Sequence, residues 1–216
     1  MPPTRIPAQV LAAAADRRSG ATPIALAAAD GLLAVADRPE LLAEAVRVLV
    51  AGQPAMAPVW HLARAARAAD PRAALEALRA ALRADTRAAV MVARAWLEQA
   101  GGPAATLSSS SLVDQVLAGR RRAGEGEPAA AGIIGADAIG PRALVNAAGS
   151  GALAARLPTL VVAVPAKLVP AGPFEGMLAP GFERVPLERF AAVVVGAELL
   201  TPRQAGRRAA ALDRPG

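Results

Sequence analysis

The 216-residue sequence predicts an α/β protein, in which an N-terminal antiparallel helical bundle (residues 1–100) precedes a short parallel-sheet domain (residues 101–216). Two observations support this division. Before residue 100, apolar residues recur at helical spacing between breaks that contain proline or glycine. After Gly101, short β-branched runs alternate with helix-like segments, which is typical of βαβ units.

The first half contains six segments with helical spacing, separated by turn signals such as Asp37-Arg38-Pro39. We expect Asp70 and Asp85 to cap the last two helices, because an aspartate at this position accepts a hydrogen bond from the first free backbone amides. The expected helices are residues 10–15, 24–36, 40–50, 59–69, 72–84 and 86–99.

The second half is expected to form a parallel sheet from strands at residues 132–139, 159–164 and 191–195. Residues 104–107 are a fourth candidate strand, which leads into a helix from Ser111. Asp137 follows the apolar run of residues 131–134, which is typical of a buried parallel strand. Because ligands in open α/β sheets bind beyond the carboxyl ends of the strands, we expect Asp137 at a binding site.

The composition excludes several kinds of site. The chain has no cysteine, so it has no disulfide, no thiolate metal ligand and no cysteine nucleophile. Its one histidine, His61, cannot form a multi-histidine metal site alone, and we predict neither a metal nor a cofactor. No apolar run approaches the ~18 residues that span a bilayer. A cytoplasmic location is therefore expected, with no membrane partner.

The basic charge has an unusual origin. The net charge is +6, and of the 24 basic residues 23 are arginines while only Lys167 is a lysine. Together with the excess of alanine, this indicates a bias in codon composition rather than selection for phosphate contacts. Aromatic side chains that would stack on bases are nearly absent. We expect a solvated basic face rather than a nucleic-acid-binding surface.

Two motifs in the second half carry a family resemblance. Gly135-Ala136-Asp137, followed by Asn146-Ala147-Ala148-Gly149-Ser150, resembles the Gly-Ala-Asp and Asn-Lys-Ile-Gly-Thr signatures of one superfamily. Its members are ribose 1,5-bisphosphate isomerases, methylthioribose 1-phosphate isomerases and the regulatory subunits of initiation factor 2B. Four more segments resemble the superfamily in the same order along the chain: residues 18–25, 53–60, 106–111 and 182–201.

The resemblance implies a Rossmann-like sheet domain, a homodimer formed through that domain, and a phosphorylated sugar or nucleotide as ligand. It implies Asp137 as general acid/base and places Ser108 where the isomerases have a catalytic cysteine. The ligand-binding positions that it implies are Gly20, Ala21, Ser109, Asn146, Gly149, Ser150 and Lys167.

The sequence also departs from the family at chemically important positions. Ser108 replaces the cysteine, and a hydroxyl exchanges a proton near neutral pH only with a strong base beside it. Ala147 replaces the lysine of the second signature, and Ser19 replaces an arginine before the Gly-Ala turn. Residues 119–131 are too short for the strand-helix-strand unit that the family has there, because such a unit needs ~30 residues. We therefore expect a truncated sheet whose edge is exposed unless a partner chain or the helical half covers it.

Several residues have a structural alternative to a role in binding. Asp137 and Asn146 could cap a helix or close a turn instead. Residues 149–151 could hold a phosphate at a helix N-terminus, but the lack of a preceding strand and of a later acid argues against dinucleotide binding. The serines of residues 108–111 could cradle an anion or form a plain loop. Lys167 could contact ligand or extend to the surface, whereas Trp60 and His61 are expected to pack inside or between the domains.

Three functions remain open from the sequence. The first is a divergent initiation factor 2B-like protein that binds a phosphorylated sugar or nucleotide with little or no catalysis. The second is an aldose–ketose isomerase acting on a phosphorylated pentose such as ribose 1,5-bisphosphate, with Asp137 as the acid/base and Ser108 orienting the substrate. The third is a structural assembly protein.

Overall fold

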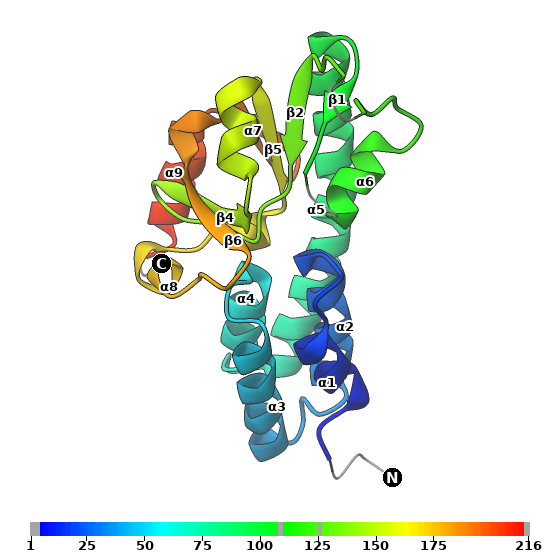
Figure 1. The fold of residues 1–216 in the computed structure, drawn as a ribbon. Coiled ribbons are helices and arrows are strands. Elements are labelled where there is room, and N and C mark those ends of the chain that lie inside the picture. Colours follow the sequence, from blue (N-terminus) through cyan, green and yellow to red (C-terminus); the bar gives the residue numbers. More distant parts are fainter. Residues whose placement is uncertain (1–4, 108–109, 125–126, 214–216) are drawn as a thin grey trace.

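The computed structural model describes residues 5–107, 110–124 and 127–213, and it has the expected helical part followed by an α/β part. Figure 1 shows the two parts end to end, with the long helix α5 running beside both. The helices of the first part are α1 (Ala8–Ala15), α2 (Ala21–Leu33), α3 (Pro39–Gly52), α4 (Ala57–Ala65) and α5 (Pro71–Ala100).

Close approach of α1 to its neighbours depends on two glycines. A Cβ atom at Gly31 in α2 would lie 2.7 Å from a side-chain carbon of Val10 in α1. A Cβ atom at Gly52, the last residue of α3, would lie 2.4 Å from the carbonyl oxygen of Ala14. Such distances are far below van der Waals contact, so only glycine lets these helices meet.

The predicted break at Asp85 is wrong, because α5 is a single helix of 30 residues that runs through this position. Neither proline nor glycine interrupts the helix after Pro71, and the side chains of Leu75, Leu82 and Ala89 are buried at seven-residue spacing along one face. Asp70 does cap the helix, since its Oδ1 accepts a hydrogen bond from the backbone N–H of Ala73 at 2.9 Å.

Asp70→Ala is therefore expected to lower the free energy of unfolding by about 1 kcal/mol, the usual cost of removing an N-cap. Asp85→Ala is the matched control, because its side chain caps nothing and alanine is the better helix former. Urea unfolding of the two variants measures the difference. Equal losses of stability would contradict the cap assignment.

The main sheet is five-stranded, in the order β1 (Ala104–Ala105), β2 (Ala131–Ile134), β5 (Thr159–Ala163), β7 (Ala192–Val195), β8 (Glu198–Leu200). All neighbours are parallel except β7 and β8. Alternate residues of the central strands face opposite ways. Val162 and Val194 join the apolar core of the helical part, whereas Val161 and Val193 join a second core on the other face.

A second, antiparallel sheet was not expected from the sequence. It contains β3 (Ala138–Ile139), β4 (Ala143–Ala147) and β6 (Phe182–Pro186). The single strand expected over residues 132–139 is therefore wrong, because the chain leaves the main sheet after Ile134 and enters the second sheet at Ala138. Asp137 lies at this crossing, where its backbone N–H donates to the carbonyl of Val145 at 2.8 Å.

The short elements of the α/β part complete the fold. The helices are α6 (Ser111–Leu117), α7 (Ser150–Arg156), α8 (Ala171–Glu175) and α9 (Pro202–Ala211), with 3₁₀ turns η1 (Pro165–Lys167) and η2 (Leu187–Arg189). The helix expected from residue 111 is present, and the basic C-terminal segment forms α9, which begins with a capping box between Thr201 and Gln204.

The sheet edge at β1 is covered by the chain itself. In the described part of residues 119–130, one isolated bridge joins Arg122 to Ala104, and no named strand is present. The N–H of Ala104 donates to the carbonyl of Arg121, and its carbonyl accepts from the N–H of Ala123. The truncated wing therefore leaves no free backbone group at Ala104.

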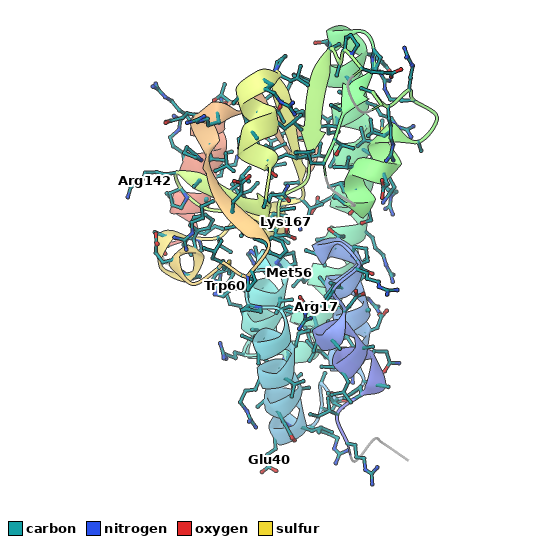
Figure 2. The ribbon with its side chains drawn as sticks, in the orientation of Figure 1. Arg17, Glu40, Met56, Trp60, Arg142 and Lys167 are labelled. Carbon is teal, nitrogen blue, oxygen red and sulfur yellow. The ribbon has the colours of Figure 1, made fainter. Side chains whose placement is uncertain are left out.

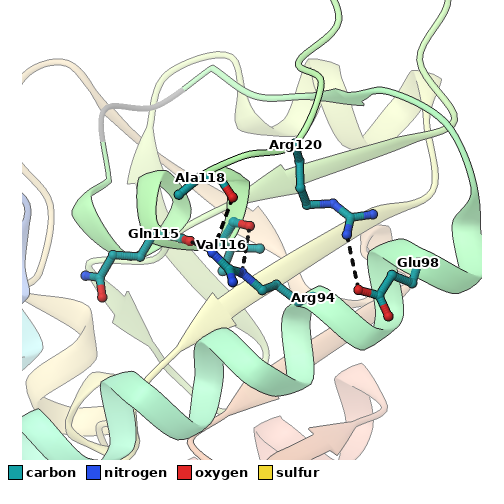
Figure 3. A network of polar contacts seen from close by, with 6 residues as sticks. All are labelled: Arg94, Glu98, Gln115, Val116, Ala118 and Arg120. Atoms are coloured by element: carbon teal, nitrogen blue, oxygen red, sulfur yellow. Dashed lines mark hydrogen bonds and ion pairs between the residues drawn. The ribbon is translucent and has the colours of Figure 1, made fainter.

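Polar contacts fix this edge to α5 (Figure 3). Arg94 of α5 donates hydrogen bonds to the carbonyls of Gln115, Val116 and Ala118 at the end of α6. Arg120 forms an ion pair of 3.4 Å with Glu98 of the same long helix. A guanidinium on the last carbonyls of a helix satisfies groups that have no partner within that helix. Helix α5 is therefore attached to α6 and to the segment that covers β1.

Candidate functional site

A cavity of about 630 Å³ lies where the helical part meets the carboxyl ends of the main-sheet strands. Residues 16–22 and 51–56 form its helical wall. Residues 135–137, the segment 110–112 and Lys167 form its sheet wall. Figure 2 shows Lys167, Met56 and Arg17 close to this junction, whereas Glu40 lies at the far end of the helical part. Volumes of ~300–1,000 Å³ are typical of sites for small molecules.

Asp137 is held in this wall from both sides. Its N–H bonds to β4, and its carbonyl accepts a hydrogen bond of 2.9 Å from the N–H of Ala57 at the start of α4. The side chain is 14% exposed and lines the cavity. The backbone of Asp137 therefore joins the two parts of the molecule while its carboxylate faces the space between them.

Lys167 lies beside this carboxylate, on the turn η1 that follows β5. Its side chain is only 5% exposed, so the alternative of a surface lysine is wrong. The Nζ atom is 3.9 Å from Oδ1 of Asp137, which is an ion pair but too long for a direct hydrogen bond. The two groups therefore keep hydrogen-bonding capacity for a molecule placed between or beside them.

Burial changes the protonation of both groups. Desolvation raises the pKa of the Asp137 carboxyl, although the charge of Lys167 opposes this shift. Desolvation lowers the pKa of the Lys167 amine, although the charge of Asp137 opposes it. Each shift favours the neutral form. The pair is therefore able to give and take a proton nearer to neutral pH than the isolated side chains.

The Asn146 motif forms a turn beside the cavity. Asn146 is 4% exposed and lines the cavity, but its Nδ2 donates to Oγ of Ser150 at 2.9 Å. Ser150 is fully buried, and its Oγ donates to the carbonyl of Ala147. Gly149 adopts a left-handed conformation with φ of 99°, which suits glycine. Neither Gly149 nor Ser150 lines the cavity.

A carboxylate already occupies the start of α7. The backbone N–H of Gly151 donates to Oε1 of Glu183 at 2.9 Å. A phosphate at this position would have to displace the carboxylate or lie against its negative charge. Among the residues implied by the second signature, the structure thus places Asn146 in the site, whereas Gly149 and Ser150 support the turn.

The other implied residues divide in two. Gly20 and Ala21 line the cavity, and Gly20 approaches Ser111, whose backbone nitrogen would lie 3.4 Å from a Cβ atom at this position. The early Gly-Ala turn and the serine segment, far apart in sequence, are thus neighbours. Ser108 and Ser109 lie outside the described residues.

Sequence reasoning missed Gln53 and Arg17 as residues of the site. The buried Gln53 side chain donates from Nε2 to the carbonyls of Ala13 and Asp16, at 2.8 and 2.6 Å, and so closes the end of α1. Arg17 donates to the carbonyl of Ala14. A polar residue directly after the glycine that ends a helix was the available signal for Gln53.

The acidic residue in the helical wall of the cavity is Asp16. Its carboxylate accepts hydrogen bonds from the backbone N–H groups of Ser19 and Arg18, which lower its pKa. This turn leaves Arg18 exposed at the mouth of the cavity. The rim therefore presents guanidinium groups, and the interior presents the pair of Asp137 and Lys167.

His61 connects the helical part to the residue after Lys167. Its Nε2 lies 2.8 Å from the carbonyl oxygen of Leu168, so the neutral ring donates this hydrogen bond. The neighbouring Trp60 packs against the apolar cluster of α8. The expectation that Trp60 and His61 pack between the domains is confirmed.

Acidification should destabilise the chain through His61. Burial lowers the pKa of this ring, so between the folded pKa and the unfolded value of about 6.5 only the unfolded chain binds the proton. Stability is therefore expected to fall as the pH falls below about 6.5. Urea unfolding at about pH 7.5 and about pH 5.5 measures this loss, and His61→Gln should show a smaller one. An equal loss in both proteins would exclude the ring as its source.

Two kinds of site or segment are absent from the described part of the chain. No three histidine or acidic side chains there are grouped as metal ligands would be. No helix within the described ranges is long and apolar enough to cross a bilayer.

No protein-family model and no curated protein sequence matches the chain. Solved structures do match it. The translation initiation factor eIF-2B of Pyrococcus horikoshii OT3 is similar with a TM-score of 0.74 and 18% identity, over 94% of this chain and 98% of that chain. The 5-methylthioribose 1-phosphate isomerase of the same organism is similar with a TM-score of 0.57 and 14% identity, over 97% of this chain and 88% of that chain.

A third similar structure is the tetrameric eIF2B-β2δ2 complex of C. thermophilum, with a TM-score of 0.65 and 13% identity, over 93% of this chain and 92% of that chain. At such identities the likeness establishes the fold. The resemblance carried by the sequence motifs is thus confirmed at the level of the fold, which initiation factor 2B subunits and a sugar-phosphate isomerase share.

Proposed function

We propose that the chain uses this fold to bind a phosphorylated sugar or nucleotide in its cavity, with little or no isomerisation. The observation that carries the proposal is the buried pair of Asp137 and Lys167 in a cavity of about 630 Å³. Burying two charges costs free energy that their mutual attraction repays only with good geometry. At 3.9 Å and without a direct hydrogen bond, the pair is better suited to holding a polar ligand than to stabilising the fold.

The chemistry of the walls fits such a ligand. The amine of Lys167 donates hydrogen bonds to ligand oxygens, and the exposed guanidinium of Arg18 supplies a positive charge for an anionic group at the mouth. The carboxylate of Asp137 accepts hydrogen bonds from sugar hydroxyls. Apolar side chains such as Met56 and Val162 line the same space and exclude water. Charged and polar groups at fixed places in a partly apolar cavity orient a small phosphorylated molecule.

Weak or absent catalysis follows from the acid/base groups. Moving a proton between neighbouring carbons needs one group that takes the proton and one that returns it near neutral pH. Asp137 can serve as one of them. The thiol of the family's isomerases is missing, because the chain has no cysteine.

An aldose–ketose isomerase is the second candidate, and one observation favours it. Burial raises the pKa of Asp137 beside the amine of Lys167, so the pair itself can exchange a proton. Turnover of ribose 1,5-bisphosphate that disappears in Asp137→Asn would establish this function. Binding of that compound without turnover would support the first proposal.

Thermal unfolding tests binding. Ribose 1,5-bisphosphate and AMP are the probes, and a ligand at 100 times its dissociation constant should stabilise the folded chain by about 2.7 kcal/mol. Arg18→Gln should reduce the shift, whereas Arg142→Gln, an exposed arginine away from the cavity, should leave it unchanged. The proposal fails when neither probe raises the melting temperature of the unaltered chain, or when the ligand-induced shift is the same in both variants.

We further propose a homodimer formed through the α/β part. The similar eIF2B-β2δ2 structure is a tetrameric complex, so the fold is compatible with association. The antiparallel strand β8 ends the main sheet and carries Leu199, which is 50% exposed. Light scattering should give twice the chain mass of 21.7 kDa, and Leu199→Lys should shift it toward one chain. A single-chain mass for the unaltered protein excludes the dimer.

A further inference from the structure

Lys167 is the only lysine among 24 basic residues, and it is also the basic residue that the fold buries beside an acid in the cavity. Every other position that needs a positive charge has arginine. A charge for an anion could come from arginine here as well, since a guanidinium binds phosphate at least as well as an ammonium group. The amine differs from the guanidinium in one relevant property, which is that it can lose its proton and become a nucleophile.

The surroundings of the amine favour that neutral form. The side chain is 5% exposed, and desolvation lowers the pKa of Lys167. Among the described residues, Asp137 is its only ion-pair partner, at 3.9 Å. The amine lines the cavity together with Ala136, Val162 and Met56, so a ligand carbon can approach it. A desolvated lysine that lines a cavity is activated toward carbonyl groups, because desolvation favours the neutral, nucleophilic amine.

We propose that Lys167 forms an imine with the aldehyde carbon of an open-chain phosphorylated sugar, an inference that rests on the proposed sugar-phosphate site. Asp137 is the acid/base that serves this step, because it is the acidic group beside the amine. The reactive partner is thereby narrowed to a phosphorylated aldehyde, because nucleotides, ketose phosphates and sugars phosphorylated at the aldehyde carbon, such as ribose 1,5-bisphosphate, present no aldehyde to the amine.

The step is balanced without an oxidant or reductant. The lone pair of Nζ forms a bond to the aldehyde carbon, the carbonyl oxygen takes a proton from the Asp137 carboxyl, and the nitrogen returns a proton to that carboxylate. In the second stage the C–O bond breaks, and the oxygen leaves as water with a proton from Asp137. Nitrogen and carbon then form the C=N bond, and the nitrogen loses its remaining proton to Asp137. One amine and one aldehyde give one imine and one water.

Reductive trapping of the full chain tests this assignment. Glyceraldehyde 3-phosphate is the probe, because its three carbons cannot close a ring, and cyanoborohydride reduces the imine to a stable secondary amine. Trypsin cleaves after an unmodified Lys167 but not after the reduced adduct, so peptide masses report the modification at this residue alone. The reference is the same chain in concentrated urea, in which Lys167 is an ordinary exposed amine.

The folded chain is expected to be modified at Lys167 faster than the unfolded chain at neutral pH, because desolvation lowers the pKa of the amine and leaves more of it uncharged. Asp137→Asn should slow trapping in the folded state by about tenfold or more, the usual contribution of a general acid/base. Glu40→Gln, a change at the far end of the helical part, should leave it unchanged. Glycerol 3-phosphate, which has the phosphate but no aldehyde, should protect Lys167.

The outcomes separate this inference from the proposed function. If trapping in the folded chain is no faster than in urea, the proposal of an imine at Lys167 is wrong. In that case, a rise in melting temperature with glycerol 3-phosphate would show that the chain still binds a phosphate. Fast trapping that glycerol 3-phosphate does not slow supports the reactive amine and contradicts the phosphate site. The comparison of the folded with the unfolded chain uses the unaltered protein. It therefore tests imine formation at Lys167 even where Asp137→Asn does not fold.

Discussion

Gly52→Ala is expected to lower the free energy of unfolding by about 3 kcal/mol, the upper part of the range for overpacking a close contact. The added Cβ atom would lie 2.4 Å from the carbonyl oxygen of Ala14 and 2.7 Å from its Cβ atom. A backbone atom cannot rotate away as a side chain can, so α1 must move from α3. The next residue, Gln53, would then lose its hydrogen bonds to the end of α1.

This change should also weaken ligand binding, because residues 16–22 form the helical wall of the cavity. Gly172→Ala is the matched control, since a Cβ atom there meets nothing within 4 Å and the residue lies in α8. That variant is expected to be as stable as the unaltered chain or slightly more stable. Urea unfolding compares the two, and equal stability of both variants would show that α1 and α3 are not tightly packed at Gly52.

The second large effect is expected at the ion pair. Asp137→Asn leaves the amine of Lys167 buried without a counter-charge, and removal of one partner of a buried pair costs about 3–5 kcal/mol. The variant should regain stability as the pH rises. Because burial lowers the pKa of Lys167, the unfolded chain binds more protons than the folded one, and stability then increases with pH.

Urea unfolding at about pH 6 and about pH 9 measures this recovery. The double variant Asp137→Asn with Lys167→Met is the control, since methionine has a similar shape and no charge. It should be more stable than Asp137→Asn alone, and the pH dependence should largely vanish. A double variant whose loss equals the sum of the two single losses would mean that the charges do not interact.

Most of the fold could be predicted from the sequence because its signals are local. Helical spacing, with breaks at proline or glycine, predicted the helices of the first part, and Asp70 was correctly predicted to cap a helix. The apolar run before Gly135 gave β2. The order of the motifs gave the fold that the similar structures share. Each of these depends on residues close together in the chain.

The errors in the predicted secondary structure arise where contacts between residues far apart in the sequence determine the backbone conformation. Asp85 is a good cap in isolation, but α5 continues because its apolar face packs on both parts of the molecule. Residues 132–139 are apolar except for Asp137, yet the chain changes sheets within them. The hydrogen bonds of Asp137 to Val145 and Ala57, which fix this change, are not visible in local spacing.

The site shows the same limit. The position of Asp137 after a strand placed it in the cavity, whereas the burial of Lys167 could not be predicted, because a lysine after a strand reaches either solvent or a ligand. Gly149 and Ser150 match a family signature, but Glu183 from a distant strand occupies the amide of Gly151. A motif thus identifies the turn, and only the surrounding fold decides which of its groups remain accessible.

The most direct test of the binding site is a crystal structure of the chain grown with ribose 1,5-bisphosphate. We predict that the sugar lies between Asp137 and Lys167, with a phosphate on the amine of Lys167 or at the guanidinium groups of the rim. A cavity that holds only water at saturating ligand, or a ligand bound elsewhere on the molecule, would contradict the proposed function.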